Sequence, residues 1–244
     1  MAGVLSARSR QLNRFLEVIM PPPLLSSVVG NRLNPLDLSL YLVLDPDLCG
    51  GLDGMVATAK VAAEHGVSIV QLRAPQWKKR QWMEAANLLK AVLDVLNVPL
   101  IINDHVDIAL ATDAAGVHVG QADMPVDVVR RLIGPNKLLG LSTSNANHLA
   151  AVPVELVDYI GVGPVYPTGT KRDTSPVIGL TTFSQLMLEK PVPVVAIGGI
   201  KAGMAAPLIK VGANGVAVVS AICGQADPAA ATKALYAEIC GARS

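Results

Sequence analysis

Short apolar runs alternate with amphipathic segments eight times along this chain, and this alternation limits the folds open to it. The apolar runs fall at residues 40–44, 67–72, 99–102, 116–119, 138–141, 159–162, 192–197 and 215–219. Helix-like segments follow them at residues 55–65, 78–96, 105–112, 126–133, 146–151, 181–188, 204–211 and 228–239. Strict alternation of this kind predicts parallel strands joined by right-handed helical crossovers.

Eight strand–helix units can close into a single (β/α)8 TIM barrel, compact at about 200 residues. A doubly wound open sheet is the alternative, although it normally uses fewer strands. No GxGxxG motif follows the first apolar run, which disfavours a dinucleotide-binding fold. The composition is 51% hydrophobic and only 16% charged, as suits a parallel sheet covered by helices. We therefore predict an α/β protein with one TIM barrel and an N-terminal extension.

Residues 1–38 differ from the rest of the chain. Three arginines lie within residues 1–14, and Glu17 is the only acidic residue before Asp37. This Arg- and Ser-containing composition resembles an organellar transit peptide. A disordered extension and a helix packed outside the domain are the alternatives. We predict a flexible or targeting extension at residues 1–38 and a catalytic barrel domain at residues 39–244.

Hydrophobicity, charge and cysteine content limit the classes of partner and the compartment that the sequence suits. No apolar run reaches the ~18 residues that a membrane-spanning helix needs. The net charge is +1 and no Lys/Arg run interleaves with aromatics, which argues against nucleic acid. Cys49, Cys223 and Cys240 lack metal-ligand spacing and fit a reducing compartment. We expect a cytoplasmic protein, or an organellar one if the extension is a transit peptide, and a homo-oligomer is compatible with the sequence.

A long loop at residues 163–180 follows the sixth apolar run. Thr168, Thr170, Lys171 and Arg172 concentrate hydroxyls and positive charge in it. Hydroxyls, backbone N–H groups and a lysine suit a phosphate group. An ordinary solvated basic loop is the alternative that this segment alone leaves open.

Polar residues also follow the other predicted strands, at the edge where TIM barrels place their chemistry. Each of these residues is compatible with a helix cap or a turn. Taken together, however, they form groups with distinct binding chemistry. Asp104 and Asp123 offer the hard oxygen ligands that suit Mg2+. Arg73, Asn103 and Lys171 suit the oxygens of a diphosphate.

A second phosphate site is predicted after the last two strands. Gly198-Gly199 and Ser220 are expected to open helices there, so that backbone N–H groups face a phosphate. The pattern therefore predicts two phosphate sites, one for a metal-assisted diphosphate and one for a phosphate on a second molecule.

Six segments, taken together, resemble the thiamine phosphate synthase family. They are QLR at 71–73, IND at 102–104, GVHVGQAD at 116–123, GPVYPTGTK at 163–171, AIGGI at 196–200 and VSAI at 219–222. The resemblance runs from about residue 40 to residue 237, in order and with natural spacing. It implies a transferase that joins 4-amino-2-methyl-5-hydroxymethylpyrimidine diphosphate to 4-methyl-5-(2-hydroxyethyl)thiazole phosphate. The products would be thiamine phosphate and diphosphate.

The resemblance also implies residue roles and a mechanism. Gln71 would contact the pyrimidine, and the catalytic residues Arg73, Asn103 and Lys171 would hold its diphosphate. Asp104 and Asp123 would bind Mg2+, the implied cofactor. The thiazole-phosphate side would be lined by Ser142, Thr168, Thr170, Gly199, Val219 and Ser220. The implied mechanism is dissociative and needs no general base. His118 lies within a strand pattern, so we expect it to be packed or structural rather than catalytic.

Two departures from the family pattern matter. Pro75 stands where the family has a lysine, and Lys78, Lys79 or Arg80 are candidates to replace that charge. Ser144 stands where the family often has a histidine. A related branch of thiazole tautomerases uses a histidine in this region, so its absence favours the synthase. An isomerase of that type and a non-catalytic thiamine phosphate sensor are the alternatives.

Overall fold

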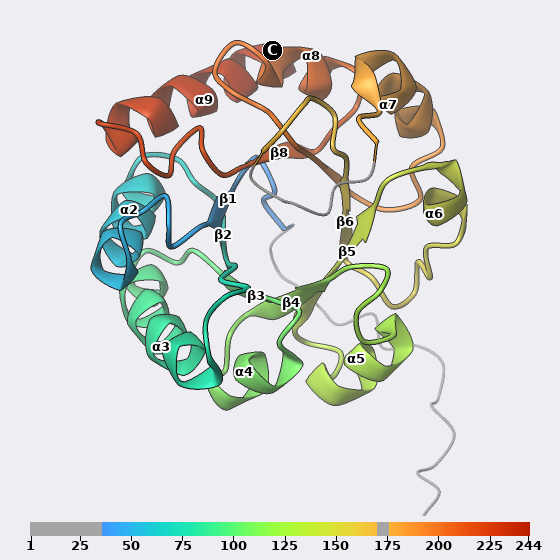
Figure 1. Ribbon diagram of the computed structural model, residues 1–244. Coiled ribbons are helices and arrows are strands. Elements are labelled where there is room, and N and C mark those ends of the chain that lie inside the picture. Colours follow the sequence, from blue (N-terminus) through green and yellow to red (C-terminus); the bar gives the residue numbers. More distant parts are fainter. Residues whose placement is uncertain (1–35, 170–175) are drawn as a thin grey trace, which may run out of the picture. The chain divides into compact units, whose positions relative to one another are not determined.

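The predicted strands form a closed barrel in which every neighbouring pair is parallel (Figure 1). The computed structural model of the chain describes residues 36–169 and 176–244. The strands are β1 (Leu40–Leu44), β2 (Ile69–Leu72), β3 (Leu100–Asn103), β4 (Gly116–Val119), β5 (Leu138–Thr143), β6 (Tyr159–Val162), β7 (Val194–Ile197) and β8 (Gly215–Val218). Because β1 pairs with both β2 and β8, the open-sheet alternative is wrong and the predicted (β/α)8 barrel is confirmed.

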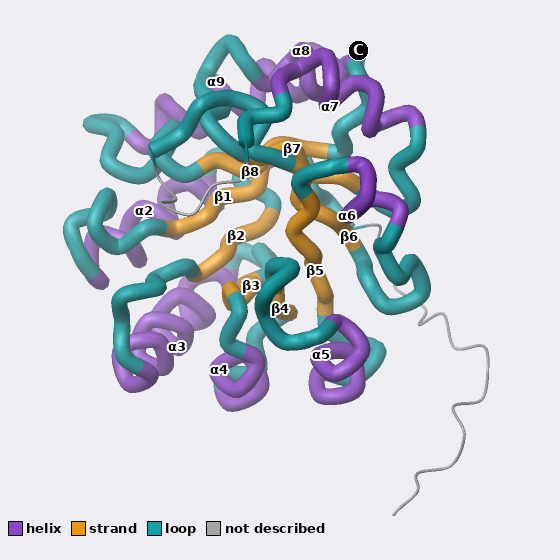
Figure 2. Tube along the Cα trace, turned by 45° about the vertical axis from the view of Figure 1, so that its right-hand side comes forward, coloured by secondary structure: helices purple, strands orange, loops and turns teal. Residues whose placement is uncertain are grey.

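Helices follow the strands and form a ring outside them (Figures 1 and 2). They are α2 (Leu52–Glu64), α3 (Lys79–Val95), α4 (Val106–Ala111), α5 (Val126–Ile133), α6 (Ala146–Ala150), α7 (Gly179–Leu188), α8 (Ala205–Lys210) and α9 (Pro228–Arg243). The largest shift of a single boundary is at the end of α9, which continues to Arg243 instead of ending at Ile239. None of the helices in the described ranges is long and apolar enough to cross a membrane.

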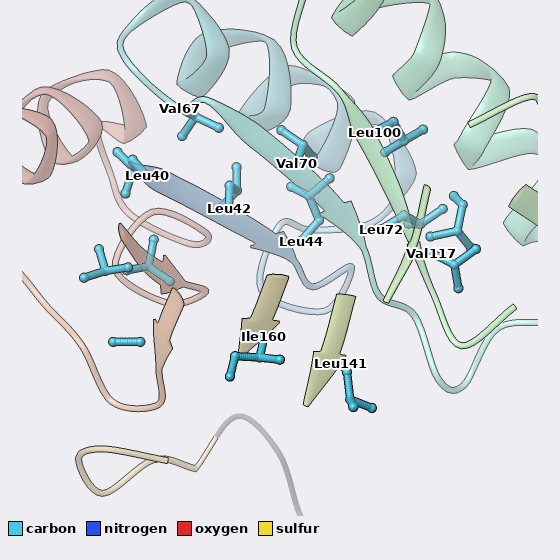
Figure 3. Packing of buried hydrophobic residues seen from close by; sticks show 14 of the residues in the cluster. Leu40, Leu42, Leu44, Val67, Val70, Leu72, Leu100, Val117, Leu141 and Ile160 are labelled. Carbon is cyan, nitrogen blue, oxygen red and sulfur yellow. The ribbon is translucent and has the colours of Figure 1, made fainter. Parts of the chain in front are cut away.

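Side chains alternate between the two faces of each strand. Leu40, Leu42 and Leu44 of β1 belong to the cluster that packs against the surrounding helices (Figure 3). Tyr41 and Val43 belong instead to a smaller cluster inside the barrel. The outer face can be wholly apolar because helices cover it, whereas the inner face can carry polar groups toward one end. This alternation decides which side chains reach the cavity described below.

The helices present the matching apolar stripes. In α3 the buried residues are Trp82, Ala85, Ala86, Leu89 and Leu93, the spacing of one helix face. At the start of this helix, the side chain of Gln81 accepts a 3.0 Å hydrogen bond from Lys78 N. This bond satisfies a backbone N–H that has no partner within the helix. The stripe itself belongs to the buried cluster that also contains the outward side chains of the strands.

The segment before β1 already packs on the barrel. Leu38 is only 3% exposed, and Leu36 packs against the inner cluster. Asp37 Oδ1 accepts a 2.9 Å hydrogen bond from Ser39 N. Most of the predicted extension, up to residue 35, lies outside the described residues.

We predict that deleting residues 1–35 leaves the melting temperature of the barrel unchanged, because this deletion retains the packed Leu36–Leu38 segment. Deleting residues 1–38 should lower the melting temperature, because it also removes the buried Leu38 side chain. Thermal unfolding of the two truncated proteins and the full chain measures the difference. Equal melting temperatures for both deletions would contradict the role given to Leu38.

Candidate active site

A cavity of about 550 Å3 opens at the carboxyl ends of the strands, within the usual size range of small-molecule sites. Of the predicted site residues, Thr170 and Lys171 lie outside the described residues. All the others line this cavity: Gln71, Arg73, Asn103, Asp104, Asp123, Ser142, Thr168, Gly199, Val219 and Ser220. The structure therefore brings together side chains that are up to about 150 positions apart in the chain because the barrel is closed.

Asp104 follows β3 in a backbone conformation that few side chains adopt. Its φ is +60°, in the left-handed region that costs energy for residues other than glycine. Its N–H donates a 2.9 Å hydrogen bond to the carbonyl of His118 on β4, and Asn103 Nδ2 donates to its carboxylate at 2.6 Å. These bonds hold the carboxylate at the rim of the cavity and orient the neighbouring amide.

Asp123 lies on the loop after β4 and is also held by the backbone. The N–H of Gly120 donates a 2.8 Å hydrogen bond to Asp123 Oδ2. Burial and Lys79 lower the pKa of His105, while the carboxylates of Asp107 and Asp123 act in the opposite direction. Asp104 and Asp123 follow the paired strands β3 and β4, and both line the cavity, so the two carboxylates come from neighbouring loops of the site.

The two carboxylates fit a hard divalent cation such as Mg2+ only if other oxygens complete its shell. Within residues 36–169 and 176–244, no group of three or more His, Cys, Asp or Glu side chains could hold a metal. Mg2+ commonly binds through one or two carboxylates, with water and substrate phosphates as its remaining ligands. The residues present therefore suit a cation that binds together with a phosphorylated substrate.

Arg73 is the only Arg or Lys among the described residues that lines the cavity. The three candidates to replace the family lysine absent at Pro75 do not line it. Lys79 Nζ instead lies 2.8 Å from Asp107 Oδ1 and 2.8 Å from His105 Nδ1. The charge of Lys79 is thus paired with Asp107, and whether one of the three replaces the family lysine stays a prediction.

The loop after β6 packs directly on the turn after β7. Val165 N donates to the carbonyl of Ile197 at 2.9 Å, and Tyr166 N donates to that of Gly198 at 3.0 Å. Gly199 has a φ of +69°, and a Cβ there would lie 2.4 Å from the carbonyl oxygen of Pro167. Glycine is thus required both by the conformation and by the close approach of the loop.

The prediction that Gly198-Gly199 and Ser220 each open a helix is wrong. After Gly198-Gly199, α8 begins only at Ala205, and after Ser220 the chain makes a short turn before α9 begins at Pro228. Any anion bound here would therefore meet the N–H groups of tight turns rather than a helix N-terminus. Backbone turns with successive N–H groups form such anion-binding concavities elsewhere.

Several lining residues were missed at the level of sequence. His118 is 9% exposed, and its ring contacts Tyr159 OH at 3.2 Å and Ser142 Oγ at 2.9 Å. It is buried, as expected, but it also lines the cavity. His148 on α6 lines the cavity too, with Nδ1 3.1 Å from Ser144 Oγ. Its position four residues after Ser144, in the predicted helix at residues 146–151, was the available signal.

Comparison with known proteins shows which family this chain belongs to. The family model described as thiamine monophosphate synthase matches residues 40–222 of the chain. The chain belongs to this family. A thiamine-phosphate synthase from Laribacter hongkongensis is 54% identical over 202 residues, which cover 83% of this chain and 95% of that protein.

Other thiamine monophosphate synthase relatives agree over the same length. One from Xanthobacter autotrophicus is 46% identical over 209 residues, covering 86% of this chain and 99% of that protein. The solved structure of a thiamine phosphate pyrophosphorylase from Pyrococcus furiosus superposes with a TM-score of 0.77 at 31% identity, covering 86% of this chain and 99% of that one. The family model itself spans the chain from β1 to β8.

We predict that Gly199→Ala destabilises the protein more than Gly203→Ala. Both glycines have positive φ, at +69° and +83°, which costs an alanine roughly 1–2 kcal/mol. Only at Gly199 does the added Cβ collide with backbone, whereas nothing lies within 4 Å of one at Gly203. The free energies of unfolding in urea should therefore differ by about 1–3 kcal/mol, the usual cost of overpacking. Equal losses for both variants would show that the loop yields to the added methyl group.

Proposed function

We propose that this protein condenses 4-amino-2-methyl-5-hydroxymethylpyrimidine diphosphate with 4-methyl-5-(2-hydroxyethyl)thiazole phosphate to form thiamine phosphate and diphosphate. The observation that carries the proposal is that every described member of the predicted site lines one cavity. Membership of the thiamine monophosphate synthase family and relatives named thiamine-phosphate synthase support it. A shared cavity is what a reaction between two bound substrates requires.

The two substrates occupy opposite sides of the cavity in this proposal. Gln71 contacts the pyrimidine, and Arg73 and Asn103 hold its diphosphate together with Lys171. Asp104 and Asp123 hold Mg2+, which when bound neutralises charge on the diphosphate leaving group. The second phosphate and its thiazole are held by Ser142, Thr168, Thr170, Gly199, Val219 and Ser220.

The residues act by positioning and charge stabilisation. The bond between the pyrimidine methylene and the diphosphate oxygen breaks first, and both electrons leave with diphosphate. Arg73 and Lys171 stabilise this developing negative charge. The thiazole nitrogen then donates its lone pair to the methylene carbocation, which forms the new C–N bond. No proton changes place in either step, so the chain need supply no general base.

An isomerase that acts on thiazole phosphate alone is the alternative, together with a sensor that binds thiamine phosphate without turnover. The absence of a histidine at position 144 no longer argues against the isomerase by itself, because His148 lines the cavity. Incubation with each substrate alone and with both, with and without Mg2+, separates the three functions. Thiamine phosphate formed only from both substrates with Mg2+ supports the synthase, and conversion of thiazole phosphate alone supports the isomerase. Binding without any product supports the sensor.

We further propose that the protein works in the cytoplasm, or in an organelle if residues 1–38 direct it there. Its three cysteines are free thiols, which supports a reducing compartment. A homo-oligomer remains a prediction, and the cavity is formed without a second copy.

We predict that Asp104→Asn and Lys171→Ala each lower kcat/KM by more than about tenfold, the scale of losing one charge-stabilising contact. Asn is the suitable replacement for Asp104 because it tolerates positive φ better than alanine. Asp94→Asn and Lys90→Ala are matched controls, since these residues form a surface pair with an N–O distance of 2.7 Å on α3. Steady-state assays should show control values near those of the wild type. A near-normal rate for either site variant would remove that residue from the proposed mechanism.

A further inference from the structure

Five polar side chains form a continuous line of hydrogen bonds inside the barrel beneath the cavity. Gln71 Nε2 donates to Tyr41 OH at 2.8 Å, and Tyr41 OH lies 2.8 Å from Tyr159 OH. Tyr159 OH lies 3.2 Å from His118 Nδ1, and His118 Nε2 lies 2.9 Å from Ser142 Oγ. All five residues line the cavity, and they come from β2, β1, β6, β4 and β5. The line thus joins the proposed pyrimidine side to the proposed thiazole-phosphate side.

The barrel leaves room for this line by placing glycine beside it. A Cβ on Gly140 would lie 2.3 Å from His118 Nδ1 and 2.3 Å from Tyr159 Cζ. The ring centroids of His118 and Tyr159 are 5.5 Å apart, and those of Tyr41 and Tyr159 are 5.8 Å apart. Any larger residue at position 140 would push the two rings apart and break the line.

Both phenols of the line are buried and protonated at neutral pH. Tyr41 is 2% exposed and Tyr159 is 0% exposed. Their burial raises the pKa of each phenol above its ordinary value, so each carries one proton at neutral pH. A buried hydroxyl proton without an acceptor is costly, so each hydroxyl must both accept and donate along the line.

One proton per hydroxyl gives the line a direction. Because an amide nitrogen only donates, Tyr41 OH accepts from Gln71 and passes its own proton to Tyr159 OH. Tyr159 OH is then left with His118 Nδ1 as the acceptor for its proton, and an Nδ1 that accepts leaves the ring proton on Nε2, which faces Ser142 Oγ. Rotating the Gln71 amide by half a turn would reverse every one of these bonds.

We propose that Tyr41, Tyr159 and His118 are positioning residues that impose this direction, so that Gln71 Oε1 faces the cavity as an acceptor and the Ser142 hydroxyl as a donor. The assignment of the two ends to substrates rests on the proposed function. An acceptor at Gln71 matches the amino group of the pyrimidine, and a donor at Ser142 matches a phosphate, which offers only acceptors when fully ionised. The reversed direction would present the wrong group to both substrates at once.

The tautomer of His118 tests the direction without any substrate. In protein labelled with 15N-histidine, nitrogen chemical shifts distinguish a proton on Nε2 from one on Nδ1, and His118→Gln assigns the signals among the chain's four histidines. We expect the Nε2–H form in the wild type and a mixture of both forms in Tyr159→Phe. Tyr236→Phe, a change at a residue 40% exposed on α9, should match the wild type. An Nδ1–H or doubly protonated ring in the wild type, or an unchanged ring in Tyr159→Phe, would overturn the proposal.

Steady-state kinetics test the consequence for the substrates. Tyr159→Phe should raise the apparent KM for both substrates by about five- to tenfold, the size expected for one misoriented hydrogen bond at each end. The value of kcat should change less, because Tyr159 contacts neither the breaking nor the forming bond. A fall in kcat at unchanged KM, or no change in either KM, would contradict the positioning role. A wild-type protein that forms no thiamine phosphate would remove the proposed function, whereas the tautomer measurement would still decide whether the line has this direction.

Discussion

Closure of the parallel barrel is the constraint on which the site depends. Pairing of β1 with β8 leaves no free sheet edge and brings the carboxyl ends of all strands to one rim. The outward side chains of every strand are then committed to packing under the helices, as Leu40, Leu42 and Leu44 do. The inward positions near the rim remain for polar groups such as Gln71, and these determine what the cavity can bind.

Within the closed barrel, tight backbone conformations fix the positions of groups at the rim of the site. Asp104 holds a left-handed conformation, and its N–H is fixed by the carbonyl of the next strand. Gly199 allows the loop after β6 to lie directly on the turn after β7. Both features place polar groups at the rim through the backbone rather than through flexible side chains. Such preorganisation is what a reaction driven by charge stabilisation requires.

Much of this architecture could be predicted from sequence because strand and helix periods are local. β1, β4, β6 and α5 have the predicted bounds, and the polar residues after the strands do converge. The helices expected directly after Gly198-Gly199 and Ser220 could not be predicted correctly, since glycine and serine suit tight turns as well as helix starts. The engagement of Lys79 by Asp107 depends on residues 28 positions apart, which no local pattern reveals.

The buried line from Gln71 to Ser142 could not be predicted either, because its members are distant in the sequence. Tyr41 and Tyr159 sit in apolar runs and look like ordinary core residues, and only the barrel brings their hydroxyl groups within 2.8 Å of each other. His118 was correctly expected to be buried, but its link to Ser142 depends on the pairing of β4 with β5. Inward-facing polar atoms on adjacent strands are therefore a property of strand register as much as of composition.

In the proposed function, one cavity holds both substrates, with the diphosphate and the thiazole phosphate on opposite sides. A crystal structure with thiamine phosphate, diphosphate and Mg2+ bound would show whether this arrangement is right. We expect the aminopyrimidine against Gln71, the diphosphate beside Arg73, and the cation bound by Asp104 and Asp123. The phosphate of thiamine phosphate should lie at the Gly198-Gly199 turn. Product bound outside this cavity, or with its phosphate at Arg73 and its pyrimidine at the glycine turn, would contradict the proposed arrangement of the two substrates.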